Sequence, residues 1–251
     1  MHPLVSEPSW LVPEPYDDVV LGPLKSGKEA EIFVVERIGA DRSCLLVHKR
    51  YRPRSVRHKG ELEALGFQQV ATFVNDAAYR DDRKIANTRD QRAVARRSRH
   101  GREVLKAQWS GHELDVLTRL WGAGAAVPYP VAATGDGLMM QYVGDHERAA
   151  APLARARLGR RELREAYDQV IENLRTFLEA GIVHADLSSY NVLWWDDRLW
   201  FIDFPQAVDL ARSQHGTELL HRDIANLFGW FARKGVACEP DVVFAELLAY
   251  L

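Results

Sequence analysis

The segment Gly181–Trp195, GIVHADLSSYNVLWW, decides how the rest of the chain is interpreted. It places His184, Asp186 and Asn191 between two apolar runs. A simple turn between buried segments more commonly uses Gly, Pro or one Asn, because these residues relieve backbone strain without a desolvation cost. The polar side chains therefore indicate a chemical task in addition to a turn.

The spacing of Asp186 and Asn191 matches the D-x-x-x-x-N catalytic loop of protein kinases, in which the Asp orients the acceptor hydroxyl and the Asn binds Mg²⁺. Asp203 follows twelve residues after Asn191, behind the run RLWFI, where kinases place a second metal ligand. Carboxylate and amide oxygens suit Mg²⁺, which neutralises phosphate charge. Each residue alone could cap a turn or a helix, but the three in this order favour phosphoryl transfer.

Three runs of β-branched and aromatic residues near the start of the chain predict an antiparallel sheet: 17–24, 30–39 and 43–51. The stretch KSGKE joins the first two, at the position of a phosphate-binding loop, although a single Ser-Gly-Lys is weak evidence. Lys49 ends the third run and Glu113 lies in a helical pattern. Kinases pair such a Lys with such a Glu, whereas either residue alone would be an ordinary surface charge.

The rest of the chain contains one irregular stretch, two helical patterns and a hairpin. From about residue 52 to residue 108 the chain is polar and Arg-rich without a sustained period, which indicates a long loop or a partly ordered insertion. Apolar residues from Leu114 to Leu120 predict a helix that ends near a glycine. Residues 129–143 read as a hairpin around Gly135–Gly137, and residues 162–181 as a long amphipathic helix.

The composition is that of an ordinary globular protein: 251 residues, 47% hydrophobic and 27% charged, with a formal net charge of -2. Residues 80–106 nevertheless carry ten Lys or Arg against four Asp or Glu. Cys44 and Cys238 are too few for a disulfide framework, and the first residues lack the pattern of a signal peptide. No apolar run approaches the roughly 20 residues of a membrane span. We expect a cytoplasmic protein with no membrane partner.

Several segments together resemble the RIO family of atypical serine/threonine kinases. KSGKEAEIF and HADLSSYN are similar to the family's S-T-G-K-E-A and H-A-D-L-S-x-x-N segments, and FIDFPQAV resembles its metal loop. The likeness extends from about Val19 to Arg233 through GHELDVLTRLWGAGAAVPYPV, LMMQYVG and HRDIANLFGWFAR. It implies a trimmed, two-lobed α+β kinase fold with a small antiparallel N-lobe sheet, a mainly helical C-lobe and ATP between them.

The same resemblance divides the chain into an N-terminal extension at 1–18, an N-lobe at 19–143 with the Arg-rich insertion at about 52–108, and a C-lobe at 144–251. The three parts would form one kinase domain. Two residues depart from the family pattern: Lys25 stands where a small hydroxyl residue is more usual, and Pro205 should stiffen the metal loop because it fixes φ.

The resemblance also implies roles for individual residues. Asp186 would be the catalytic base, and Asn191 and Asp203 would bind Mg²⁺. Asp203 would in addition accept a phosphoryl group transiently as an aspartyl-phosphate. His184 would pack the catalytic loop and Asp223 would brace it. The residues expected to bind ATP are Ser26, Gly27, Lys28, Glu29, Lys49, Glu113, Met140, Tyr142 and Val143.

The expected function is ATP- and Mg²⁺-dependent phosphorylation of protein Ser or Thr, or of the chain itself, or ATP hydrolysis. Two alternatives stay open. A small-molecule kinase of the aminoglycoside or choline type shares the lobes, but more often has a His or an acid where this chain has Ser188, and lacks GKEA. An RNA or ribosome assembly factor that uses ATP as a switch would keep every site. The basic segment 80–106 could contact RNA or an acidic partner, or be a solvated loop.

Overall fold

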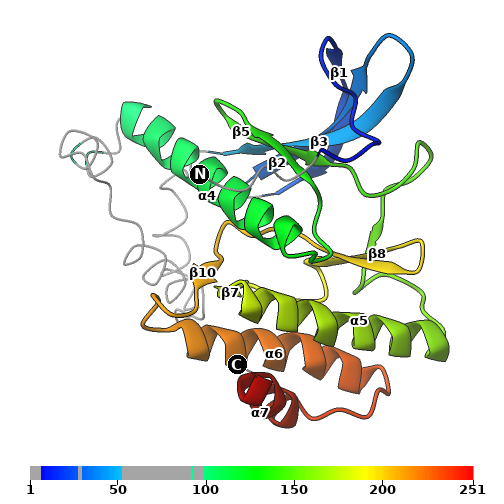
Figure 1. The fold of residues 1–251 in the computed structure, drawn as a ribbon, viewed down its shortest axis with the longest axis vertical. Coiled ribbons are helices and arrows are strands. Elements are labelled where there is room, and N and C mark those ends of the chain that lie inside the picture. The colour runs from blue at the N-terminus through cyan, green and yellow to red at the C-terminus, as the bar shows by residue number, and fades with distance from the viewer. Residues whose placement is uncertain (1–6, 28–29, 53–91, 93–95, 97–98, 251) are drawn as a thin grey trace, which may run out of the picture.

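A five-stranded antiparallel sheet forms the first part of the molecule (Figure 1). The computed structural model describes residues 7–27, 30–52, 92, 96 and 99–250. The predicted three-stranded sheet is confirmed, and the predicted hairpin extends it, because its second strand pairs with the third strand of the sheet. In the spatial order β1-β2-β3-β5-β4, the strands are β1 Asp17–Ser26, β2 Ala30–Ile38, β3 Ser43–Tyr51, β5 Gly137–Gln141 and β4 Pro130–Ala133.

The long helix α4, Arg99–Gly122, lies against this sheet and contacts β4 and β5. The predicted helix around Leu114–Leu120 is confirmed, but α4 begins at Arg99, within the stretch that we expected to be irregular. Its first residues, RHGREVLKAQ, include several good helix formers without an apolar period, so propensity rather than patterning explains the difference. Residues 53–91, most of the expected insertion, lie outside the described residues.

The second part of the molecule is mainly helical, as expected for the predicted α+β class. Helices α5, Arg160–Glu179, and α6, Gly216–Arg233, lie side by side, and α7, Pro240–Tyr250, packs on them (Figure 1). The apolar face of α5 is buried at intervals of three or four residues, which confirms the predicted amphipathic helix. Small strands lie between these helices and the N-lobe: β6 Ala151–Pro152, β8 Val192–Trp195 and β9 Arg198–Phe201 form one sheet, and β7 Ile182–Val183 pairs with β10 Val208–Asp209.

The main core anchors the segments that carry the polar motif. Phe177 of α5 makes edge contacts with Phe201 at the end of β9 and with Phe204 just beyond it, at centroid distances of 5.1 and 5.7 Å. All three rings are buried. The backbone segment that carries Asp203 is therefore anchored in the core on both sides. None of the described helices is both long enough and apolar enough to cross a membrane.

A second, smaller core covers the opposite face of the N-lobe sheet. Leu11 packs there with Val35, Leu46 and Met139. Arg42 fixes the same N-terminal segment by donating to the carbonyl oxygen of Leu11 at 2.9 Å. Part of the predicted N-terminal extension is thus integrated into the N-lobe, with β1 beginning at Asp17.

Candidate active site

The loop between β7 and β8 is held from below by Asp223 of α6. The two carboxylate oxygens of Asp223 accept the backbone N–H groups of Ala185 and Leu187 at 2.7 and 2.9 Å. Ala185 has a φ of 63°, in the left-handed region that non-glycine residues rarely adopt, so these bonds stabilise an unfavourable backbone conformation. Asp186 lies between the two anchored residues and is exposed. The sequence expectation of Asp223 as a brace agrees with this geometry.

His184 joins the same loop to the strand that leads to Asp203. Its Nε2 lies 3.0 Å from the carbonyl oxygen of Ile202, and its Nδ1 lies 3.3 Å from the N–H of Asp186. We therefore assign the proton to Nε2, which donates, while Nδ1 accepts. The ring contacts Phe204 at 4.6 Å. Burial lowers the pKa of His184 to about 4, so it is a neutral packing residue near pH 7.

This burial predicts a measurable pH dependence. The folded-state pKa of His184, about 4, lies below its ordinary value of 6.5, so the unfolded chain binds more protons between these two pH values. Its contribution to stability is complete above pH 6.5 and is lost as the pH falls towards 4. His184→Gln keeps a donor for Ile202 and should remove up to about 3 kcal/mol of that acid-induced loss. Urea unfolding of both proteins from pH 4 to 7 measures the difference.

Asp223 titrates in the opposite sense, because its burial raises the pKa to about 7. It is present in both proteins, so subtracting one pH profile from the other isolates His184. Parallel profiles would show that His184 is not a buried neutral group.

The two expected metal ligands come from adjacent segments. The N–H of Ile202 donates to the carbonyl oxygen of Asn191 at 3.0 Å, which brings Asn191 close to Asp203. The amide nitrogen of Asn191 donates to the carbonyl oxygen of Asp186 at 2.8 Å, a bond that does not use its amide oxygen. Among the described residues, no three His, Cys, Asp or Glu side chains form a metal-binding group. One amide and one carboxylate fit Mg²⁺ that is shared with a nucleotide, because Mg²⁺ is commonly held by one or two carboxylates plus phosphate oxygens.

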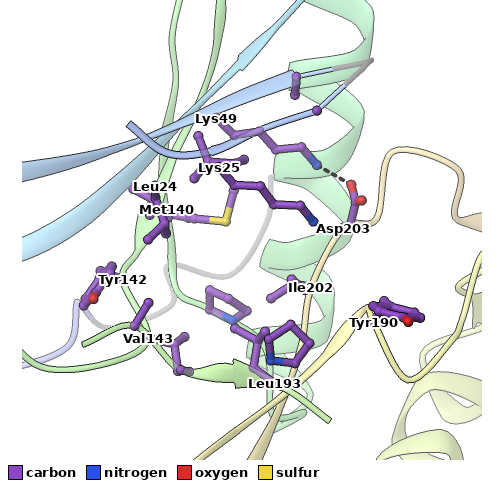
Figure 2. A pocket seen from close by; sticks show the side chains of 18 of the residues that line it. Leu24, Lys25, Lys49, Met140, Tyr142, Val143, Tyr190, Leu193, Ile202 and Asp203 are labelled. Carbon is purple, nitrogen blue, oxygen red and sulfur yellow. Dashed lines mark hydrogen bonds and ion pairs between the residues drawn. The ribbon is translucent and has the colours of Figure 1, made fainter. Parts of the chain in front are cut away.

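Lys49 lies at the centre of a charge cluster in which Lys49 and Glu113 are buried and Asp203 is partly exposed. The Nζ of Lys49 donates to Oε1 of Glu113 at 2.8 Å. It also donates to Oδ1 of Asp203 at 2.5 Å (Figure 2). Glu113 is fully buried and also accepts the hydroxyl of Tyr51 and, at 3.0 Å, the N–H of Phe204. The cluster therefore joins β3, α4 and the metal loop.

The charges in this cluster stabilise one another. Burial opposes the charge of Lys49, but the carboxylates of Asp203 and Glu113 outweigh it and raise the pKa of the ammonium. Burial would likewise raise the pKa of Asp203, but Lys49 outweighs it, with a smaller contribution from Lys25, and the pKa is lowered. Both Lys49 and Asp203 are ionised at neutral pH.

A cavity of about 680 Å³ opens between the N-lobe sheet and the C-lobe, beside this cluster (Figure 2). Apolar side chains from β3, β5 and β8 form much of its wall, which suits the flat ring of a nucleotide base. Of the residues that the sequence assigned to ATP and metal, six line the cavity: Gly27, Lys49, Met140, Tyr142, Val143 and Asp203.

The other expected site residues lie elsewhere. The hydroxyl of Ser26 does not line the cavity and accepts a hydrogen bond from Arg52 at 2.9 Å. Glu113 acts on the site through Lys49 rather than from the cavity wall. Asp186 and Asn191 are on the loop next to the cavity and not in its lining. Two expected residues, Lys28 and Glu29, lie outside the described residues.

Sequence reasoning missed several contributors. Tyr51 follows Lys49 by two residues in one strand and so shares its face, which the alternation of β-strands could have indicated. The exposed Tyr190 and the cation Arg155 also line the cavity, and the N–H of Ala154 binds the carbonyl oxygen of Ser189 at 2.8 Å. No one-dimensional pattern connects those two segments.

Comparison with known proteins agrees with the geometry. A family model described as the RIO domain matches residues 67–243. The chain belongs to the RIO family. The RIO-type serine/threonine-protein kinase Rio1 of Haloferax volcanii is 30% identical over 234 residues, which cover 93% of this chain and 70% of that protein. The predicted resemblance is confirmed, and with it the kinase-like fold class of this RIO domain.

Two human RIO proteins match over shorter stretches. Human serine/threonine-protein kinase RIO3 is 35% identical over 136 residues, 54% of this chain and 26% of that protein. Human serine/threonine-protein kinase RIO1 is 34% identical over 173 residues, 62% of this chain and 30% of that protein. The chain therefore spans about a third or less of each human relative.

Proposed function

We propose that this RIO protein transfers the γ-phosphoryl group of ATP, with Mg²⁺, to a serine or threonine hydroxyl, and to water when no acceptor is bound. The observation that carries this proposal is the Lys49–Glu113–Asp203 cluster at the wall of an apolar cavity, next to the loop of Asp186 and Asn191. The relatives' names, serine/threonine-protein kinases, support the same reaction class.

Each polar residue has a distinct task in this proposal. Asn191 and Asp203 would hold Mg²⁺, which supplies charge neutralisation at the transferring phosphoryl group. Lys49, oriented by Glu113, would contact the phosphates. Asp186, exposed beside the cavity, would accept the proton of the attacking hydroxyl. The apolar cavity wall would enclose the adenine and exclude water from one side of the nucleotide.

Asp203 is also proposed as a transient phosphoacceptor. In that step a carboxylate oxygen of Asp203 forms a bond to the γ-phosphorus, the bond from phosphorus to the bridging oxygen breaks, and ADP leaves. An acceptor hydroxyl or water would then take the phosphoryl group and restore the carboxylate. The ion pair with Lys49 supports this role because it orients the Asp203 carboxylate beside the cavity.

The cellular setting belongs to the proposal as well. The two cysteines are unpaired, which fits a reducing cytoplasm. Contact of residues 80–106 with RNA or a ribosomal partner is motivated by their basic composition, and most of these residues lie outside the described part of the chain. The phosphoacceptor would be a protein Ser or Thr, or the chain itself.

Incubation with [γ-³²P]ATP and Mg²⁺ tests the function by the destination of the label. Label on protein supports a kinase, and release of labelled phosphate supports an ATPase. Hydroxylamine separates an acyl phosphate on Asp203, which it cleaves, from phosphoserine, which it leaves. Label on an aminoglycoside or choline in parallel reactions would favour the small-molecule kinase instead, and label that stays in ATP throughout would overturn the proposal.

A further inference from the structure

We propose that Lys25 is a second phosphate-binding cation of the cavity, which contacts the terminal phosphate of ATP and makes binding selective for ATP over ADP. The inference rests on the proposed function, because it presupposes that the cavity holds a nucleotide. It assigns to one residue of this chain a positive charge at the phosphate that the position's usual small hydroxyl side chain does not carry.

The geometry of the β1–β2 hairpin directs Lys25 into the cavity. Lys25 pairs in register with Ile32, and both residues line the cavity, whereas Ser26 pairs with Glu31. Because directly paired residues of antiparallel strands share a face, Ser26 lies on the opposite side of the sheet from Lys25. The pairing shifts by one residue between Pro23 and Lys25, and this shift determines which residues at the end of β1 face the cavity.

The neighbouring polar groups of the hairpin form hydrogen bonds with other groups of the protein. The N–H of Gly27 donates to the carbonyl oxygen of Ala30 at 2.9 Å and closes the turn. The hydroxyl of Ser26 is engaged by Arg52, which also pairs with Glu31 at 2.5 Å. Among residues 24–27, the Lys25 ammonium is therefore the polar group that the hairpin presents to the cavity.

Lys25 and Lys49 converge on the same place from neighbouring parts of the sheet. Figure 2 shows both side chains pointing toward Asp203. Lys49 is neutralised by two carboxylates, Glu113 and Asp203. The Lys25 ammonium interacts with Asp203 at longer range, but within the described parts of the chain no hydrogen bond or ion pair fixes it.

Because Lys25 forms no ion pair among the described residues and Lys49 forms two, Lys25 is the cation available to bind the terminal phosphate. Transfer of the γ-phosphoryl group requires positive charge at its oxygens, and the Lys25 ammonium, which interacts with Asp203 without forming an ion pair, can supply that charge. Lys25 lies at the cavity side of Asp203, the residue expected to act on the γ-phosphate. A contact there is available with ATP and lost with ADP.

The test compares nucleotide affinities of the full chain by isothermal titration calorimetry. Lys25→Ser restores the usual small hydroxyl, and we expect it to weaken Mg-ATP binding by about tenfold, ADP binding by about twofold or less, and adenosine binding not at all. Lys25→Arg keeps the charge and should recover most of the ATP affinity. Lys234→Ser, a lysine at the end of α6 on Trp230, removes the same charge far from the cavity and should bind all three ligands as the wild type does.

The outcomes separate this inference from the function on which it rests. If the wild type binds ATP and Lys25→Ser binds it equally well, the inference is wrong and the proposed function stands. An equal loss for ATP and ADP would also contradict a terminal-phosphate contact. If the folded wild type binds no ATP, the proposed function fails, and the role of Lys25 fails with it. Thermal unfolding of each variant confirms that exposed position 25 tolerates the change.

Discussion

Asp203→Asn is expected to lower the turnover of Mg-ATP on the order of 10³-fold while the protein stays folded. The substitution removes a negative oxygen from the proposed metal site and one of the two carboxylates that face Lys49. Asparagine suits the backbone here, because Asp203 has a φ of 73° and Asn tolerates the left-handed region far better than Ala. Initial rates of product formation at saturating Mg²⁺ and ATP measure the effect.

Asp197→Asn provides a matched control for this prediction. Asp197 also has a positive φ, 55°, but it is exposed in the hairpin between β8 and β9. The same chemical change at a similar backbone conformation outside the site should leave turnover unchanged. Turnover by Asp203→Asn within a few-fold of the wild type would remove Asp203 from the chemistry.

Glu113→Ala is expected to destabilise the protein by roughly 3–5 kcal/mol, the range for breaking a buried ion pair from one side. Glu113 is fully buried and accepts from Lys49, Tyr51 and the N–H of Phe204, so its removal leaves three donors without this acceptor. The effect is larger than that of a surface pair because water cannot replace the lost carboxylate. Urea unfolding at neutral pH measures the free energy of unfolding.

Tyr51→Phe measures how much one of the three hydrogen bonds to Glu113 contributes to stability. It removes one of the three hydrogen bonds to Glu113 and keeps the ring that contacts Trp109, so it should cost only about 1 kcal/mol. A cost below 1 kcal/mol for Glu113→Ala would mean that water or another acceptor replaces the carboxylate. Glu113 would then not be the residue that links β3 and α4 to the segment of Asp203.

Local sequence patterns predicted the strands and helices that carry the site residues, because the formation of each element depends mainly on residues close together in the sequence. The β-branched and aromatic run at residues 43–51 predicted the strand of Lys49, and the spacing from Asp186 to Asn191 predicted the loop that we propose to be catalytic. The pairing of Lys49 with Glu113 was anticipated from the kinase-like order of residues. The contact between Lys49 and Asp203 was not, since 154 residues separate them and only the closure of the two lobes brings them together.

The hairpin between β1 and β2 shows why side-chain direction was harder to predict. Strict alternation from Val19 would assign one face to every second residue of β1, but the pairing is irregular at two places, between Val20 and Gly22 and between Pro23 and Lys25. Each irregularity shifts the faces by one residue. The two shifts cancel by Lys25, which shares the cavity face with Ile32 while Ser26 does not, but the residues between them cannot be assigned to a face by counting. Bulges of this kind depend on pairing with the next strand, so they leave no period to read.

The most direct test of the account measures nucleotide binding and phosphoryl transfer separately in the wild type and in Asp186→Asn. Asp186 is exposed and lies outside the cavity lining, so the variant should bind Mg-ATP within about threefold of the wild-type affinity. Without its base, single-turnover transfer of the γ-phosphoryl group should fall by at least about 10²-fold. That combination would support a site in which the cavity binds ATP and the braced loop performs the chemistry. Equal transfer rates in two proteins that bind Mg-ATP equally would contradict it.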